Sequence, residues 1–201
     1  MRRTRRGFSL IEVLVVMGIL AVLIAASIGG YSAVQKSAER AAAADLVAQV
    51  ASALKTLHAQ NEGRWPLRMA MVGETGGELD PDVAYQFVSG RVKYLSLAAS
   101  GGKLIGYDRF GILDPWGTKK IKQLGESATL GAVQDHRLWF AVDTDGDGII
   151  SGANVGGESV DVRATAIVWC AGRDGKMETY SKGRRGDDVY SWTEGQTKNV
   201  K

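Results

Sequence analysis

The sequence predicts an α+β fold in which a long N-terminal α-helix, membrane-spanning in its first half, packs on a small antiparallel β-sheet head domain. The first observation is an apolar run over residues 8–30 whose one ionisable side chain is Glu12. A helical apolar stripe follows it, and the C-terminal half is Gly-rich with short apolar runs. These patterns divide the chain into a basic leader at 1–7, a membrane helix at 8–30, an amphipathic continuation at 31–62 and a globular domain at 63–201.

The apolar run of about 23 residues is long enough for a helix to cross a bilayer, which requires roughly 20 apolar residues. Basic residues precede it, namely Arg2, Arg3, Arg5 and Arg6. Such residues stay on the cytoplasmic side, so the rest of the chain is expected across the membrane. Four of the 25 basic residues lie here, which leaves 21 against 22 acidic ones. The net positive charge therefore belongs to the leader and gives no support to nucleic-acid binding.

Residues 31–62 continue the helix, because apolar side chains recur there at spacings of three to five with charges between them. The stripe consists of Val34, Ala38, Ala41, Leu46, Val50, Leu54 and Leu57. Over Ser9–Gln60 the expected rod is roughly 75 Å long at about 1.5 Å per residue. Gly63 suits a C-cap and Pro66 cannot continue the helix, so the rod is predicted to end there.

The C-terminal half contains short apolar-rich runs between Gly- and Asp-rich turns, a pattern typical of short antiparallel strands. The predicted strands are "KLIGY", "TKKIKQL", "RLWFAV", "SVDVRATAIVWC" and "KMETYS". A short helix is expected within "DVAYQFVSGRVKYLSLAAS". We expect the sheet to pack on the exposed half of the long helix.

Two ordinary interpretations compete for the N-terminus. A secretory signal peptide has a basic region, an apolar region and small residues for cleavage, here "AAS" at 25–27. The length of the apolar run and the helix that follows without a break argue against it. A plain signal anchor is the other interpretation, but it gives no reason for Glu12.

The stretch "RRGFSLIEVLVVMGILAVLIAA" resembles the N-terminal signature of type IV pilins and type II secretion pseudopilins. The resemblance implies cleavage after Gly7 by a membrane prepilin peptidase and N-methylation of Phe8, and Glu12 becomes the fifth residue of the mature chain. It also implies a precursor in the bacterial inner membrane, an assembly platform there, and a filament shared with other pilin-like subunits. Many relatives carry a helix-disrupting proline where this chain has Gly29-Gly30, so we expect a flexible or locally unwound stretch there.

Glu12 has a physical role that agrees with this resemblance. An acidic side chain in a membrane helix costs roughly 3 kcal/mol on insertion scales, so it usually faces a partner or a cavity. Cleavage after Gly7 creates a free amine on Phe8 at the same depth. We expect the two groups to pair between neighbouring subunits, which neutralises both and sets the register of one rod against the next.

The stretch "DTDGDGIISGAN" presents Asp143, Asp145 and Asp147 at alternate positions before Gly148. This resembles the first half of an EF-hand calcium loop, in which alternating carboxylates converge on the ion. Asn154 occupies the twelfth position, however, where a bidentate glutamate is expected. A solvated Asp-Gly hairpin turn uses the same residue types, so both interpretations stay open.

A second resemblance covers "LDPWG" at 113–117 and "VWCAGRDGKMETYSKGRRGDDVYSW" at 168–192. Both are similar to the major pseudopilin of type II secretion, a family that binds a structural calcium ion in its last loop. The resemblance offers Asp174, Asp187 and Asp188 as calcium ligands. The stretch "SKGRR" is basic where relatives are commonly Gly-rich and acidic, and a charged surface loop is the alternative.

No arrangement typical of an enzyme occurs in the sequence. It contains no Gly-x-Ser-x-Gly elbow, no paired Cys and His signature, no phosphate loop and no zinc-ligand spacing. Cys170 has no cysteine to pair with and is expected in the core. His58 and His136 are expected at the surface, and the tryptophans of the C-terminal half as packing anchors.

The sequence therefore predicts a pilin-like structural subunit, not an enzyme, that polymerises into a pseudopilus of a type II secretion-like system. A type IV pilus subunit for adhesion, motility or DNA uptake is the alternative in the same class. A membrane-anchored calcium-binding domain that never assembles is the alternative from a different class. Glu12 distinguishes these classes, because an anchor does not need it.

Overall fold

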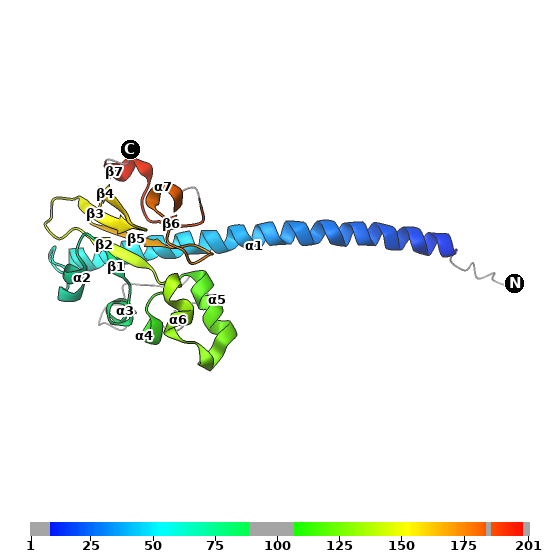
Figure 1. The fold of residues 1–201 in the computed structure, drawn as a ribbon, viewed down its shortest axis with the longest axis horizontal. Helices are drawn as coiled ribbons and strands as arrows, with labels where there is room; N and C mark the ends of the chain where they lie inside the picture. Colours follow the sequence, from blue (N-terminus) through cyan, green and yellow to red (C-terminus); the bar gives the residue numbers. More distant parts are fainter. Residues whose placement is uncertain (1–8, 89–106, 184–185, 199–201) are drawn as a thin grey trace. The chain divides into compact units, whose positions relative to one another are not determined.

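A computed structural model describes residues 9–88, 107–183 and 186–198, with the backbone alone at 26–30, 86–88, 107–108 and 198. The chain divides into two compact units, Met1–Ala38 and Glu39–Lys201, so the boundary lies inside the first helix. In the second unit, the end of that helix, two sheets and several short helices pack together (Figure 1). The predicted α+β class, a long N-terminal helix on a small antiparallel sheet, is confirmed.

The long helix α1 (Leu10–Gln60) ends where the sequence predicts. Beyond it the backbone is left-handed at Glu62 and Gly63, with φ of 56° and 77°. The Gly63 N–H donates to the His58 carbonyl at 2.9 Å. This glycine therefore satisfies a carbonyl at the helix end, as a C-cap glycine does.

The local unwinding expected at Gly29-Gly30 is wrong, because α1 continues through both glycines. A helix is held by backbone hydrogen bonds, which glycine also makes. Each glycine weakens a helix by about 1 kcal/mol relative to alanine, and the strong helix formers on either side tolerate that cost.

The central sheet has the strand order β1-β2-β5-β6, with all neighbours antiparallel. Its strands are β1 (Gly77–Glu78), β2 (Trp139–Val142), β5 (Ala166–Cys170) and β6 (Val189–Tyr190). Side chains alternate between the two faces, since Phe140 and Val168 pack with Leu54 of α1 in one core. Ile167 and Trp169 point into a second core on the opposite face. The sheet is therefore buried on both faces.

A second sheet, in the order β3-β4-β7, covers the face that α1 does not cover. Its strands are β3 (Ile150–Val155), β4 (Glu158–Val162) and β7 (Thr197–Lys198). Its inward side chains, Ile150, Val155, Val160 and Val162, complete the second core. The head thus has three layers, with the four-stranded sheet in the middle.

Short helices fill the connections between these layers. They are α2 (Leu67–Val72), α3 (Pro81–Val88), α4 (Tyr107–Phe110), α5 (Pro115–Leu124), α6 (Leu130–Val133) and α7 (Tyr180–Gly183), with 3₁₀ turns η2 (Gly125–Ser127), η3 (Gln134–His136) and η4 (Glu194–Gln196). The helix predicted after residue 80 is confirmed as α3, and the segment that follows it at 89–106 lies outside the described residues.

Two of the predicted strands are wrong. The run "TKKIKQL" forms the body of α5, because Asp114 caps the helix and Pro115 occupies its first position. The run "KMETYS" is irregular until Tyr180, where α7 begins. The strands predicted in "RLWFAV" and "SVDVRATAIVWC" are confirmed, whereas "KLIGY" lies outside the described residues except for its last position.

Candidate functional site

The first acidic loop follows β2 and folds around Asp143. This side chain is 5% exposed, and its two oxygens accept the N–H groups of Gly146 at 2.7 Å and Gly148 at 2.9 Å. Both glycines have φ of 80°, which other residues rarely adopt. Asp145 accepts the Asp147 N–H at 3.1 Å. The loop therefore curls around the aspartate that begins it.

Glu74, from the loop after α2, joins this acidic loop. Its carboxylate accepts the Ser151 N–H at 2.8 Å and the Thr144 hydroxyl at 3.3 Å. Glu74, Asp143 and Asp145 each offer one oxygen, and these atoms lie within 4.8 Å of one another. Carboxylate oxygens are the ligands that Ca²⁺ prefers, so these three residues could hold the ion.

Asp147 and Asn154, two of the predicted calcium-loop positions, do not belong to this group of carboxylates. Asp147 is not in that group, and its carboxylate accepts the Ile149 N–H at 2.7 Å. Asn154, at the twelfth position, accepts the Gly157 N–H in the hairpin turn between β3 and β4. Glu74 supplies a glutamate that the loop itself lacks. Residue spacing within the loop could not predict the contribution of Glu74, since Glu74 lies 77 positions from Ser151.

The second acidic loop does not bring its three aspartates together as one group of metal ligands within the described residues. Asp187 accepts the N–H groups of Arg173 and Asp174, at 2.7 and 3.1 Å. Asp174 accepts the Lys176 N–H at 2.8 Å. These two carboxylates are thus used to shape the loop. Of the basic stretch "SKGRR", Arg184 and Arg185 lie outside the described residues, whereas Lys182 lies in α7.

Asp188 is the unusual member of the second loop. It is 3% exposed, and its Oδ2 accepts the Glu178 N–H at 3.2 Å and the Tyr190 hydroxyl at 3.1 Å. Its Oδ1 is buried with no hydrogen-bond partner in the described part of the chain. Burial raises the pKa of Asp188 to about 6, partly offset by the hydrogen bonds from Tyr190 and Glu178. A buried oxygen of this kind fits a bound cation.

The Asp-Pro-Trp-Gly segment starts α5 and contains a buried pair. Asp114 is fully buried, and its oxygens accept the Gly117 N–H at 2.7 Å and contact His136 Nδ1 at 3.1 Å. Burial raises the pKa of Asp114, against the lowering effect of His136 and of the backbone bonds. His136 Nε2 has no hydrogen-bond partner among the described residues.

The surface position predicted for His136 is wrong, because the side chain is 1% exposed. Its partner Asp114 lies 22 positions away, and a histidine looks buried only once such a partner is known. His58 is half-buried, with its ring 4.4 Å from that of Trp65. The packing predicted for the tryptophans is confirmed at Trp169 and Trp192, which lie in the second core.

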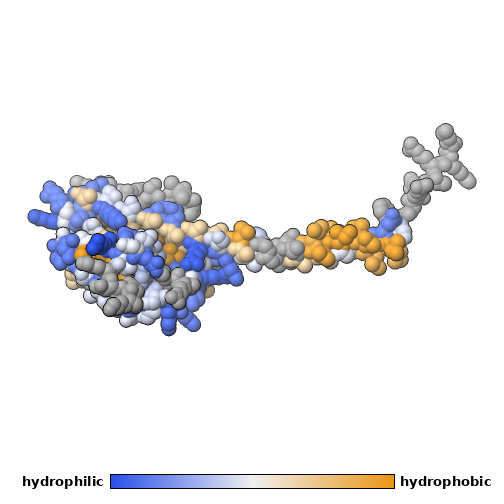
Figure 2. Space-filling model, turned by 90° about the horizontal axis from the view of Figure 1, so that it is seen from above, coloured by the Kyte–Doolittle hydropathy of each residue, from blue (hydrophilic) through white to orange (hydrophobic). Residues whose placement is uncertain are grey.

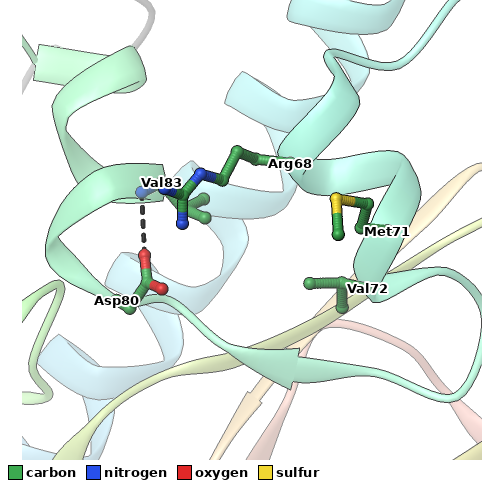
Figure 3. Close-up of a pocket in the computed structure, with 5 residues that line it drawn as sticks. All are labelled: Arg68, Met71, Val72, Asp80 and Val83. Carbon is green, nitrogen blue, oxygen red and sulfur yellow. Dashed lines mark hydrogen bonds between the residues drawn. The ribbon is translucent and has the colours of Figure 1, made fainter.

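A pocket of about 510 Å³ lies between α2 and α3 (Figure 3). It is lined by Arg68, Met71, Val72, Asp80 and Val83. Asp80 accepts the Val83 N–H at 2.9 Å and so caps α3, while Arg68 pairs with Asp82 at 2.9 Å. These polar groups stabilise α2 and α3, and their arrangement does not indicate a catalytic or ligand-binding role.

Glu12 lies in the first turn of α1. Its carboxylate accepts the backbone N–H of Ser9 at 2.9 Å. A glutamate that reaches back three residues to the N-cap backbone makes one half of a capping box, and its charge is favourable at a helix N-terminus. The Ser-x-x-Glu spacing could have predicted this bond. Gly7 and Phe8 lie outside the described residues.

Large apolar side chains are exposed on all sides of α1 in the first unit, from Leu10 at 82% to Ile24 at 60%. Figure 2 shows this hydrophobic surface in orange. Within the residues that the structure describes, no helix is both long enough and apolar enough to span a membrane. The span predicted at 8–30 also includes Phe8 and the side chains of 26–30, which are outside those residues.

Residues 2–28 match the family model described as the prokaryotic N-terminal methylation motif. This is the type IV pilin and pseudopilin signature. The resemblance predicted from "RRGFSLIE" is therefore confirmed. No curated protein and no solved structure matches the chain.

The methylation motif contains Gly7, Phe8 and Glu12. It is the motif of pilin-like subunits, which are processed by a prepilin peptidase and anchored by their N-terminal segment. The two acidic loops and the Asp114–His136 pair lie outside the matched residues, so what they do must be argued from the geometry of the head.

Proposed function

We propose that this protein is a pilin-like structural subunit that prepilin peptidase processes and that polymerises into a pseudopilus of a type II secretion-like system. The methylation motif over residues 2–28 carries the proposal. The apolar side chains exposed around α1 support it, because a helix that is apolar all round needs lipid or other protein around it. Lipid would surround it before assembly, and neighbouring subunits afterwards.

In the precursor, the leader arginines hold the N-terminus in the cytoplasm, so the head crosses the inner membrane. The apolar segment at 8–30 then serves as the span. Glu12 enters this span with one hydrogen bond already made, to the Ser9 N–H of its own helix. That bond reduces the cost of placing a carboxylate in lipid.

Cleavage after Gly7 changes the best partner for Glu12. The new amine on Phe8 is a cation, and an ammonium–carboxylate bond is stronger than one from a neutral amide N–H. Glu12 therefore turns from Ser9 to the Phe8 amine of a neighbouring subunit, and the pair sets the register between rods. The assembly platform and the other pilin-like subunits act at this stage.

The similarity of "LDPWG" and of the segment at 168–192 to the major pseudopilin favours secretion over a pilus. A subunit of an adhesive, motility or DNA-uptake pilus is the alternative. Cys170 argues mildly against adhesive pilins with a long paired-cysteine loop, since it is the one cysteine in the chain and is buried. An anchored calcium-binding domain that never assembles is the candidate from another class.

Calcium is proposed as a structural cofactor of the head. At the first loop, Glu74, Asp143 and Asp145 would hold the ion, because their oxygens converge to within 4.8 Å. At the second loop, the buried Oδ1 of Asp188 supports a site in which Asp174 and Asp187 are the other ligands that the resemblance offers. An ion at either place would stiffen a loop that already depends on its carboxylates.

Two measurements test this function. Intact-mass analysis of the purified protein should show loss of residues 1–7, with or without one methyl group, and cleavage near Ser27 would instead identify a signal peptide. Glu12→Leu should insert into the membrane and yet fail to enter filaments, while Glu126→Leu, an exposed carboxylate of the head, should enter normally. Normal incorporation of Glu12→Leu would count heavily against the register role of Glu12, whereas absence of the wild-type protein from filaments would favour the non-assembling anchor.

A further inference from the structure

We propose that Glu39 fixes the first turn of the head-bound part of α1, and that the buried Asp114–His136 pair positions the groups that bind Glu39. Glu39 is the first α1 residue of the second unit. One of its oxygens accepts the Trp116 indole N–H at 3.0 Å, and the other accepts the Lys119 ammonium at 3.1 Å. Both donors belong to α5, 77 and 80 positions along the chain. We call Glu39, Trp116 and Lys119 the Glu39 clasp.

A second positive group, Arg173, also acts on Glu39. Burial raises the pKa of Glu39, but the bonds from Lys119 and Trp116 and the charges of Lys119 and Arg173 outweigh it and leave the pKa below its usual value. Arg173 lies in the turn after β5, where its N–H is held by Asp187 at 2.7 Å. Glu39 therefore faces cations from two separate segments, α5 and the turn at 172–175.

His136 contacts both of these segments. A Cβ added to Gly117 of α5 would come within 2.6 Å of the His136 Cβ. A Cβ added to Gly175 would come within 3.3 Å of the ring atoms Cε1 and Nε2. The ring thus fills the space between two glycines, and a close-packed interior leaves it no room to move.

Asp114 fixes the ring and the helix together. One carboxylate oxygen contacts His136 Nδ1 at 3.1 Å, while the other caps α5 through the Gly117 N–H at 2.7 Å. The orientation of α5 is therefore tied to the position of His136, and with it the Trp116 and Lys119 donors. His136 acts on Glu39 through these groups and is a positioning residue.

The clasp is a property of the folded head and does not depend on polymerisation. The role of the clasp in a filament rests on the proposed function, since in a filament subunit the clasp would fix the position along α1 where the head begins. Glu12 would then set the register between rods, and Glu39 would fix the first turn of α1 that belongs to the head.

Hydrogen exchange of the full chain in detergent micelles tests the clasp. Glu39→Leu removes the bonds from both Trp116 and Lys119, and it should raise the exchange rates of the amides at 39–47 at least about tenfold, the change expected from the loss of one charge-assisted hydrogen bond alone. Glu39→Gln should have a smaller effect, because its amide oxygen still accepts from Trp116. Trp116→Phe removes the indole N–H together with part of the ring, so it has a packing cost of its own, and the effect of combining it with Glu39→Leu should be less than the sum of the two separate effects. His136→Asn should raise the same rates.

Matched variants separate the clasp from general destabilisation. Asp82→Asn breaks the Arg68 pair, whose side chains are 59% and 62% exposed, and should leave the exchange at 39–47 unchanged. Wild-type rates in Glu39→Leu, or fully additive effects of Glu39→Leu and Trp116→Phe, would overturn the proposal. Hydrogen exchange is measured on unassembled protein. A negative result for the Glu39 clasp therefore leaves the Glu12 assembly test unaffected, and a negative assembly test leaves the clasp unaffected.

Discussion

Gly117 lies directly against His136, so that a Cβ added to the glycine would come within 2.6 Å of the His136 Cβ. Gly117→Ala must therefore displace a buried ring that is bonded to Asp114. Overpacking of this kind typically costs about 1–3 kcal/mol, and we expect the free energy of unfolding to fall by that amount. Denaturant unfolding of the head measures it.

Gly131 offers the matched control for this substitution. It also lies in a helix, α6, and a Cβ there would meet nothing within 4 Å. Alanine is the better helix former by up to about 1 kcal/mol, so Gly131→Ala should be neutral or stabilising. Equal losses in the two variants would show that the contact with His136 does not determine the cost.

The elements of the fold that follow local patterns could be predicted from the sequence. Of the predicted stripe, Val50, Leu54 and Leu57 lie in the core beneath the sheet and Leu46 packs against it, whereas Val34, Ala38 and Ala41 are exposed. The run that contains Val168 is a strand, as predicted. The error at "TKKIKQL" arose although the helix-start signal, Asp114 followed by Pro115, stood in the sequence. A start signal determines the structure of a run that lacks clear periodicity.

The candidate sites could be predicted only in part, because their partners lie far apart in the chain. Asp143 and Asp145 were identified by alternate spacing, but Glu74 reaches them only after α2 packs beside β2, where the Gly73 carbonyl accepts the Val142 N–H at 3.1 Å. Spacing also placed Asp147 with them, although its side chain turns to Ile149. Tertiary contacts made by the folded head decide such sets.

Cys170 should be unreactive in the native protein. The side chain is fully buried, and burial raises the pKa of the thiol to about 12, with a smaller contribution from Asp114. The thiolate is the reactive form, so its population at pH 8 is negligible. A disulfide-exchange reagent should label Cys170 only in denaturant. Rapid labelling of the folded protein would contradict this burial.

Asp114 should make stability fall as pH rises. Burial raises its pKa above the unfolded value of about 3.9, so the unfolded chain loses its proton first. The contribution is fully present below that value and is lost as pH rises through the folded pKa. Asp114→Asn keeps an oxygen to cap Gly117 and should remove this slope. Free energies of unfolding at a series of pH values, with chelator present, measure the difference.

A wild-type curve parallel to that of Asp114→Asn would mean that the carboxyl group titrates normally. Asp135→Asn serves as the control, because Asp135 is an exposed neighbour of His136. Its curve should keep the wild-type slope.

Calcium should stabilise the head through Glu74 more than through Asp147. Glu74 shares the group with Asp143 and Asp145, whereas Asp147 does not. An ion bound only by the folded state adds about 2.7 kcal/mol at 100 times its Kd, which raises the melting temperature. Between chelator and millimolar Ca²⁺, Glu74→Gln should lose most of this shift in melting temperature, and Asp147→Asn should keep it.

Asp188→Asn tests the second loop in the same way, so a smaller shift in Glu74→Gln or in Asp188→Asn identifies a site at the first or the second loop. A shift that survives in Glu74→Gln but disappears in Asp147→Asn would favour the EF-hand set of Asp143, Asp145 and Asp147, and no shift in the wild type would exclude a stabilising calcium ion at either loop.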